Sequence, residues 1–150
     1  MRLFGTGLFT GFSPIASGTL GSLLGLAIYL IPGFEHPYVI MPSCALALVL
    51  GAKAAGSLER RYGHDPAEVT IDEILGMWVS LFLVPKSISA AVAAFIVFRV
   101  LDIVKPWPAR KFDSLRGGMG IMMDDVVAGI YTNLLVHLLV RLEFHTILPF

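Results

Sequence analysis

Two pairs of adjacent carboxylates lie where apolar stretches of the chain begin. Asp72 and Glu73 precede the apolar run to Val84, and Asp124 and Asp125 follow a glycine-rich turn before another apolar run. The positive end of a helix dipole favours carboxylates there, which is the simplest explanation of either pair. Carboxylates at the head of a membrane helix are nonetheless costly unless they are paired, hydrated or metal-bound. The second pair in particular predicts a functional site.

Basic residues lie close to a fifth carboxylate. Arg99, Asp102 and Lys105 are three residues apart, so a helix places them on one face, where a ladder of ion pairs is the plainest explanation. The combined set nevertheless suits phosphate chemistry. Carboxylate oxygens favour Mg²⁺ or Mn²⁺ over zinc, and Lys and Arg hold anionic oxygens. Such a metal polarises P–O bonds and activates water. At a membrane face this chemistry predicts a phospholipid headgroup as substrate.

A segment of small and hydroxyl residues, 5–22, precedes the first long apolar stretch. Ser17 or Thr19 can cap a helix there, and the free backbone N–H groups would form an anion site. A flexible loop with an N-cap is the plainer interpretation. His64, in the next polar loop, is either a general acid or an ordinary loop residue.

The composition and the apolar stretches predict the fold class. Hydrophobic residues make up 56% of the 150 residues and charged residues 15%, against roughly 25% charged in soluble domains. We predict an all-α, polytopic helical membrane protein, one domain over 1–150, with its polar motif loops on one cytoplasmic face. Its about five apolar helices span 19–31, 38–55, 72–84, 88–105 and 121–140, and prolines follow three of them. The first and third fall short of the roughly 20 residues of a full span and are candidates for re-entrant segments or for helices tilted at the membrane interface.

The distribution of basic residues favours five crossings. If all five helices cross and the N-terminus is cytoplasmic, only Lys86 and Arg141 lie outside. The net charge of zero excludes the basic excess that nucleic-acid binding requires. Cys44 is the single cysteine, so the chain contains neither an internal disulfide nor a thiolate metal cluster. The cysteine-phosphatase loop, the Asp-x-Asp-x-Thr loop and the Walker A motif are absent from the sequence.

Three blocks of the sequence resemble the bacterial phosphatidylglycerophosphatase A family. They are GFSPIASGTLGS at 11–22, DEILG at 72–76, and FRVLDIVKPWP at 98–108 continuing to GGMGIMMDDVVAG at 117–129. The resemblance implies a Mg²⁺-dependent integral membrane phosphatase. It would hydrolyse phosphatidylglycerophosphate to phosphatidylglycerol and inorganic phosphate at the cytoplasmic side of a bacterial inner membrane. The positions matching the family pattern are Thr19, Asp72, Glu73, Asp102, Lys105, Asp124 and Asp125.

We assign expected roles to these residues from their chemistry. The expected metal ligands are Glu73, Asp124 and Asp125. The expected catalytic residues are Asp72, Asp102 and Lys105. The expected substrate-binding residues are Thr19, Arg99 and Lys105. The expected partners are the phospholipid substrate and membrane lipid, and the sequence leaves an oligomer open.

Two other classes of function remain as alternatives. A small transporter or channel subunit would use the carboxylates to move ions or protons, and it predicts carboxylates near mid-membrane. A non-enzymatic assembly partner would pack through Gly21-x-x-x-Gly25, but this leaves the acidic residues unexplained. The carboxylates lie at helix ends beside Lys and Arg, which favours headgroup chemistry.

Overall fold

The computed structural model describes residues 5–7, 16–63, 66 and 68–147, and these residues form helices and connecting loops without a strand. The helices are α2 (Ser17–Leu30), α3 (Pro37–Tyr62), α4 (Ile71–Leu81), α5 (Ile88–Val104), α6 (Ala109–Asp113) and α7 (Gly118–Ile147). The all-α prediction is therefore confirmed for this part of the chain.

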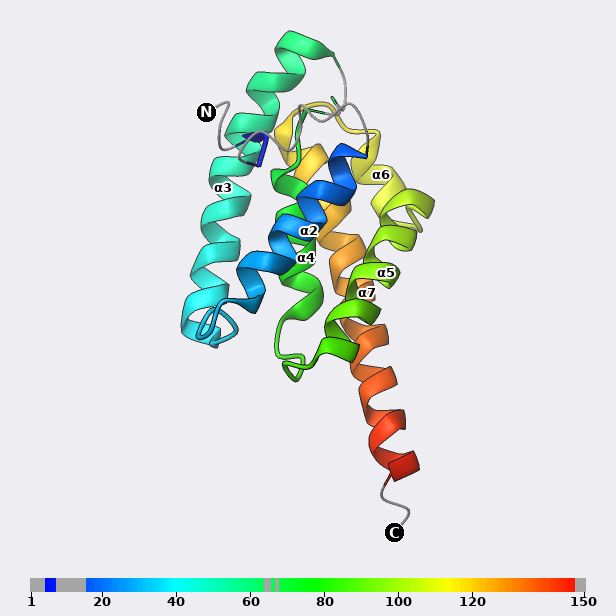
Figure 1. The fold of residues 1–150 in the computed structure, drawn as a ribbon. Helices are drawn as coiled ribbons and strands as arrows, with labels where there is room; N and C mark the ends of the chain where they lie inside the picture. Colours follow the sequence, from blue (N-terminus) through cyan, green and yellow to red (C-terminus); the bar gives the residue numbers. More distant parts are fainter. Residues whose placement is uncertain (1–4, 8–15, 64–65, 67, 148–150) are drawn as a thin grey trace.

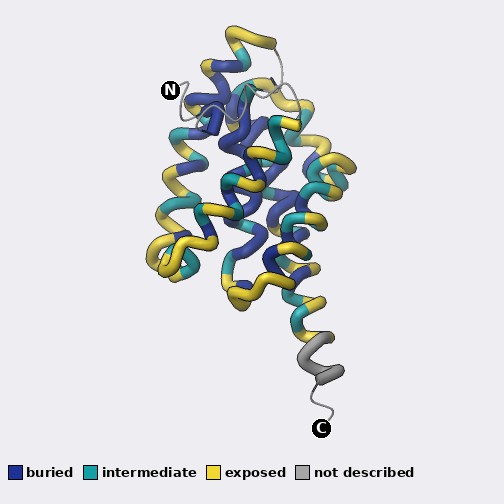
Figure 2. The backbone as a smooth tube through the Cα atoms, in the orientation of Figure 1, coloured by how far each residue is buried: buried dark blue, intermediate teal, exposed yellow. Residues whose placement is uncertain are grey.

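Helix α4 forms the centre of the bundle. It packs against α2, α3, α5 and α7, and all its residues except Glu73 and Val79 are buried. Figure 2 shows this burial as dark blue along the middle of the molecule. Glycines allow the close approach of α4 and α7, since a Cβ added to Gly129 would lie 2.6 Å from the carbonyl oxygen of Gly76. The apolar sequence of α4 is thus explained by contact with protein on every side.

Successive long helices run in opposite directions (Figure 1). The N-terminal ends of α2, α4 and α7 therefore lie at the same end of the bundle as the C-terminal ends of α3 and α5. The short helix α6 connects α5 to α7 at this end. This arrangement brings together polar segments that are far apart in the sequence.

Two helices are long and apolar enough to cross a membrane within the described residues: α3 and the Gly118–Leu142 part of α7. This differs from the five crossings that the sequence predicts. At 1.5 Å per residue, α2, α4 and α5 are about 21, 17 and 26 Å long, less than the roughly 30 Å of a hydrocarbon core. Hydropathy predicted a third crossing over 72–84, whereas α4 is apolar because the other helices surround it.

The outside of the bundle carries many large apolar side chains. On α5, Ile96, Val100 and Ile103 are 56%, 53% and 73% exposed, and exposed leucines follow the outer side of α7. An apolar exterior of this extent indicates contact with lipid or with another protein. Together with the two long apolar helices, it indicates membrane association.

One ion pair joins the two loops at the opposite end of the bundle from α6. Lys86 Nζ, in the α4–α5 loop, lies 2.8 Å from Glu35 Oε2 in the α2–α3 loop and donates to the Ile31 carbonyl oxygen at 3.1 Å. The hydrogen bond from Lys86 lowers the pKa of the Glu35 carboxyl below its ordinary value. This pair is distant from the acidic residues and provides a reference position for the experiments below.

Candidate active site

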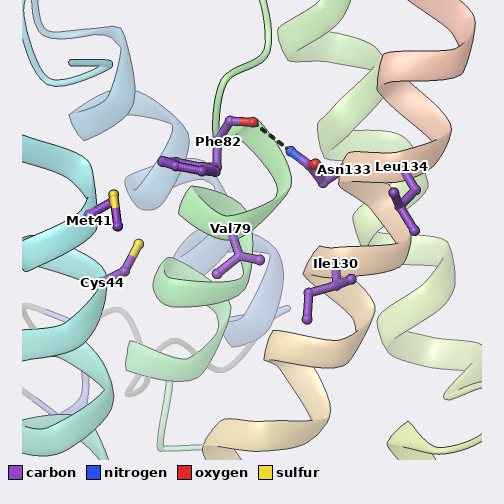
Figure 3. Close-up of a pocket in the computed structure, with 7 residues that line it drawn as sticks. All are labelled: Met41, Cys44, Val79, Phe82, Ile130, Asn133 and Leu134. Atoms are coloured by element: carbon purple, nitrogen blue, oxygen red, sulfur yellow. Dashed lines mark hydrogen bonds between the residues drawn. The ribbon is translucent and has the colours of Figure 1, made fainter. Parts of the chain in front are cut away.

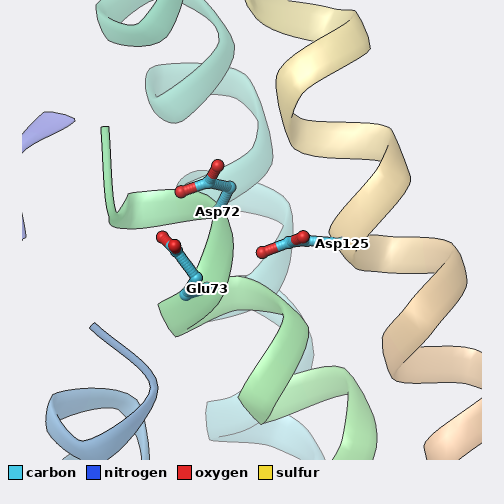
Figure 4. Close-up of side chains that lie close together, drawn as sticks. All are labelled: Asp72, Glu73 and Asp125. Atoms are coloured by element: carbon cyan, nitrogen blue, oxygen red, sulfur yellow. The ribbon is translucent and has the colours of Figure 1, made fainter. Parts of the chain in front are cut away.

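Three carboxylates meet at the N-terminal end of α4 (Figure 4). Asp72 and Glu73 belong to the first turn of α4, and Asp125 reaches them from α7. One oxygen from each side chain lies within 4.8 Å of the others. Asp72 is 7% exposed and Asp125 is 3% exposed, so two of the three are withdrawn from water.

The chemistry of these three side chains fits a divalent cation. Buried carboxylates repel one another, and burial of their charge is costly without a compensating positive charge. Glu73 Oε2 and Asp125 Oδ2 are buried without a hydrogen-bond partner among the described residues. Several carboxylate oxygens converging on one point are the ligands that Mg²⁺ and Ca²⁺ take in proteins. The group Asp72, Glu73 and Asp125 is therefore the candidate metal site.

The other two predicted carboxylates face cations. Asp124 Oδ2 accepts a hydrogen bond from Lys105 Nζ at 2.7 Å, and Lys105 also contacts Asp113. Asp102 Oδ2 accepts from Arg99 Nη1 at 2.8 Å. Adjacent residues on a helix point about 100° apart, so Asp124 and Asp125 serve different neighbours. The geometry thus groups Asp72, rather than the expected Asp124, with Glu73 and Asp125.

The three carboxylates and the two ion pairs share one cleft of about 320 Å³. It lies between α2, α4, α5 and α7, and it contains both negative ligands for a cation and positive groups for an anion. Its lining residues are Ser17, Gly18, Pro66, Val69, Asp72, Glu73, Arg99, Asp102, Ile103, Lys105, Asp124 and Asp125. The cleft therefore brings together all the predicted site residues except Thr19.

Helix α2 contributes its first two residues to the cleft. Ser17 and Gly18 line it, whereas the half-buried Thr19 is not among the lining residues. The helix begins after Ala16, which has a left-handed φ of 51°, and no side chain caps it. The expected cap by Ser17 or Thr19 is therefore wrong. His64, the open candidate for a general acid, lies outside the described residues.

Two polar contacts in the site were not predicted from the sequence. Asp113, on α6, is the second carboxylate on Lys105, and Ser22 Oγ accepts from Arg99 Nη1 at 3.4 Å. Ser22 lies four residues after Gly18, on the same face of α2. Its spacing would therefore have predicted this contact if α2 had been known to border the site. Asp113 carried no signal, because α6 itself was not predicted.

A separate apolar pocket of about 360 Å³ lies between α3, α4 and α7 (Figure 3). Met41 and Cys44 line one side, and Ile130 and Leu134 the other. Its polar side chain, Asn133, donates to the Phe82 carbonyl oxygen at 2.7 Å. Among the residues that the structure describes, no charged side chain lines this pocket, so it offers no charged group that could bind a metal ion or a phosphate.

The sequence matches one known family along most of its length. A family model described as phosphatidylglycerophosphatase A matches residues 3–140. The chain belongs to the phosphatidylglycerophosphatase A family. The resemblance seen in the sequence motifs is thereby confirmed, and the chain is an enzyme of the phosphatase class.

Curated relatives include members of this family from two bacteria. The phosphatidylglycerophosphatase A of Escherichia coli is 38% identical over 132 residues, covering 86% of this chain and 77% of the relative. That of Haemophilus influenzae is 35% identical over 143 residues, covering 91% and 86%. A Bacteroides thetaiotaomicron protein with the provisional name phosphatidylinositol-3-phosphatase is 42% identical over 142 residues, covering 89% of each chain. No solved structure matches the chain significantly.

Proposed function

We propose that this phosphatidylglycerophosphatase A family member hydrolyses phosphatidylglycerophosphate to phosphatidylglycerol and inorganic phosphate, and that it requires Mg²⁺. The observation that carries the proposal is the shared cleft, in which Asp72, Glu73 and Asp125 lie beside Arg99 and Lys105. Carboxylates alone would suit a site that binds only a cation, and basic side chains alone would suit a site that binds only an anion. Their combination suits a phosphate monoester bound between a metal and basic side chains.

The side chains of α5 bind the phosphate in this proposal. Arg99 and Lys105 direct their positive groups into the cleft, where each offers N–H donors to phosphate oxygens. Their carboxylate partners, Asp102 and Asp124, hold these groups in position before substrate arrives. Asp72, Glu73 and Asp125 would hold Mg²⁺, which withdraws electron density from the phosphate oxygens when bound.

Hydrolysis requires two proton transfers. A bond forms between a water oxygen and phosphorus, and the bond between phosphorus and the glycerol oxygen breaks. We assign Asp102 to accept the proton of the attacking water, because it lies in the cleft outside the three-carboxylate group. One of its oxygens is bonded to Arg99, which leaves the other for this role. The departing glycerol oxygen takes its proton from solvent in the cleft.

The proposed location is the cytoplasmic side of a bacterial inner membrane, with the chain crossing it more than once. The end of the bundle with the cleft also carries Arg60, Arg61, Arg110 and Lys111, whereas Lys86 lies in the loop at the other end. Cytoplasmic segments of membrane proteins are enriched in Lys and Arg, which supports a cytoplasmic cleft.

A second candidate substrate follows from the Bacteroides relative, whose name specifies a 3-phosphate on phosphatidylinositol. Both lipids carry a phosphate monoester on a polyol headgroup. The groups in the cleft could act on either lipid, so the two candidate substrates are distinguished by comparing their rates of hydrolysis. Transport is not favoured, because the carboxylates lie at helix ends with basic partners in a family of phosphatases.

The first test is phosphate release by purified protein in detergent. We expect release from phosphatidylglycerophosphate that requires Mg²⁺, stops with EDTA, and exceeds release from phosphatidylinositol 3-phosphate. A reversed order of rates would favour the second candidate. No release from either lipid by folded protein would reject a lipid phosphatase and return transport to consideration.

Substitution of one carboxylate tests the metal site. Asp125→Asn and Glu73→Gln keep the side-chain shape but remove negative charge, and we expect each to lower kcat on the order of 100-fold or more. The matched control is Glu35→Gln, which removes a carboxylate at the opposite end of the bundle and should leave kcat unchanged. Full activity of Asp125→Asn at low Mg²⁺ would contradict the assignment.

A further inference from the structure

A second pocket shares Lys105 with the proposed catalytic cleft. It has a volume of about 500 Å³ and occupies the turn between α5 and α6. Its lining residues are Val104, Lys105, Pro106, Trp107, Arg110, Lys111 and Ser114. Lys105 belongs to both cavities, so the two are adjacent. The roles assigned above use Lys105 but none of the other residues of this pocket.

The basic groups of this second pocket differ from those of the cleft. In the cleft, Arg99 and Lys105 are each held by a carboxylate. Arg110 and Lys111 are exposed and form no ion pair with any residue that the structure describes. Arg110 Nη2 makes a 3.4 Å hydrogen bond to the Val104 carbonyl oxygen. Two positive charges beside the cleft are therefore available to an anionic ligand.

An aromatic ring and an apolar surface border the same pocket. Lys111 Nζ lies 5.6 Å from the centre of the Trp107 ring, and Trp107 is 71% exposed. Tryptophan is enriched at the headgroup level of membranes, where its amphipathic ring is stable. The apolar outer face of α5 begins here, with Val104 54% exposed and Ile103 73% exposed. A ligand of this pocket thus meets positive charge on one side and an apolar surface on the other, as a phospholipid requires.

The proposed substrate carries two phosphates. The terminal phosphate is the monoester to be removed, and the second is the diester that joins the headgroup to the acylated glycerol. Only a three-carbon glycerol unit separates them. We propose that the α5–α6 pocket binds the diester phosphate through Arg110 and Lys111, while the monoester lies in the cleft, with Lys105 between the two. This inference rests on the proposed function and extends it to the choice of substrate.

The kinetic test uses the double variant Arg110→Gln/Lys111→Gln. We expect KM for phosphatidylglycerophosphate to rise about tenfold, because two charge-assisted contacts to the diester are lost. We expect kcat to stay within about twofold, since neither side chain reaches the cleft. Short-chain phosphatidylglycerol has the diester phosphate alone, so we expect it to inhibit the double variant more weakly than the native protein, by the same factor as the rise in KM. Inorganic phosphate competes for the cleft alone, so it should inhibit the native protein and the double variant equally.

Arg60→Gln/Arg61→Gln is the matched control. These two exposed arginines also lie at the cleft end of the bundle, and Arg61 lies 5.7 Å from the centre of the Tyr62 ring, but neither lines the α5–α6 pocket. We expect KM of this control to equal that of the native protein. An equal rise in KM in both double variants would mean that basic residues at this end merely attract anionic lipid, which would overturn the proposal. An unchanged KM in Arg110→Gln/Lys111→Gln would overturn it as well.

A binding measurement separates failure of this pocket from failure of the proposed reaction. Trp107 emission, followed in a Trp78→Phe background, reports binding of short-chain phosphatidylglycerol in Mg²⁺-free buffer without turnover. We expect the Arg110→Gln/Lys111→Gln change to weaken binding about tenfold, with no such response to inorganic phosphate. If the native protein hydrolyses no phosphatidylglycerophosphate but shows this difference, the reaction is wrong and the diester pocket stands. Equal binding by the variant and its background overturns the pocket.

Discussion

At Gly18, helix α2 comes close to the carboxylates of the cleft. A Cβ added there would overlap Glu73 Oε1 and would lie 3.1 Å from both terminal nitrogens of Arg99. Gly25, two turns further along α2, also packs against α4. A Cβ added there would lie 3.0–3.1 Å from two backbone atoms of Ile74 and from the Met77 Cβ. The same small residue thus makes room for chemistry at one position and for packing at the other.

Alanine at these two glycines is expected to have opposite effects. Gly18→Ala should lower kcat about tenfold by displacing Glu73 and Arg99, with the melting temperature held by the roughly 1 kcal/mol gain in helix propensity. Gly25→Ala should instead lower the free energy of unfolding by about 1–3 kcal/mol, because backbone atoms at 3.0–3.1 Å cannot move aside. Kinetics and thermal unfolding of both variants measure this. Native activity of Gly18→Ala would contradict the placement of α2 at the site.

Side-chain chemistry made most of the site predictable at the scale of single residues. Seven of the eight expected positions are Asp, Glu, Arg or Lys, because a charged side chain in an apolar chain is costly unless it serves a purpose. The spacing predicted the Arg99–Asp102 ion pair within α5, but the contacts of these charges between helices were not predictable. Which of Asp124 and Asp125 faces Asp72 and Glu73 depends on how α7 is rotated against α4, and a sequence does not contain that rotation.

At the scale of elements, the apolar stretches located the helices well but not their ends. Helix α3 continues past Ala55 through a charged turn to Tyr62, and it ends at Gly63, which has a φ of 104°. Polar residues do not end a helix that extends beyond the apolar core, whereas a glycine with a positive φ, which other residues rarely adopt, does. Helix α6, Ala109–Asp113, has only five residues and is too short to show a periodic pattern.

A buried hydrogen bond joins α2 and α4 in addition to their close packing. Trp78 Nε1, on α4, donates to the Gly25 carbonyl oxygen of α2 at 3.0 Å, and the side chain is 9% exposed. Trp78→Phe removes this bond and leaves a small void, and we expect it to lower the free energy of unfolding by about 1–3 kcal/mol. Trp107→Phe, at a 71% exposed site, should change it by less than about 0.5 kcal/mol. Equal effects of the two substitutions would contradict the packing of α4 described here.

At the scale of the whole molecule, hydropathy predicted a membrane protein but not how its helices share the apolar environment. A sliding window cannot distinguish a helix surrounded by lipid from one surrounded by protein, and α4 is of the second kind. The alternating directions of the five longer helices nevertheless place the carboxylates of the cleft at one end of the bundle. The side of the membrane on which that end lies decides whether the enzyme meets its substrate from the cytoplasm.

Single cysteines at the two ends of the bundle can determine this orientation. In a Cys44→Ala background, Ser114→Cys lies after α6 near the cleft, and Ser89→Cys lies at the first turn of α5 at the opposite end. Both serines are exposed, so both cysteines should react when the membrane is permeabilised. With a membrane-impermeant maleimide on bacterial cells whose inner membrane is intact, we expect labelling of Ser89→Cys alone, because the strongly basic end remains inside. Labelling of Ser114→Cys alone would place the cleft outside the cell and would remove the support that the basic residues give to a cytoplasmic active site.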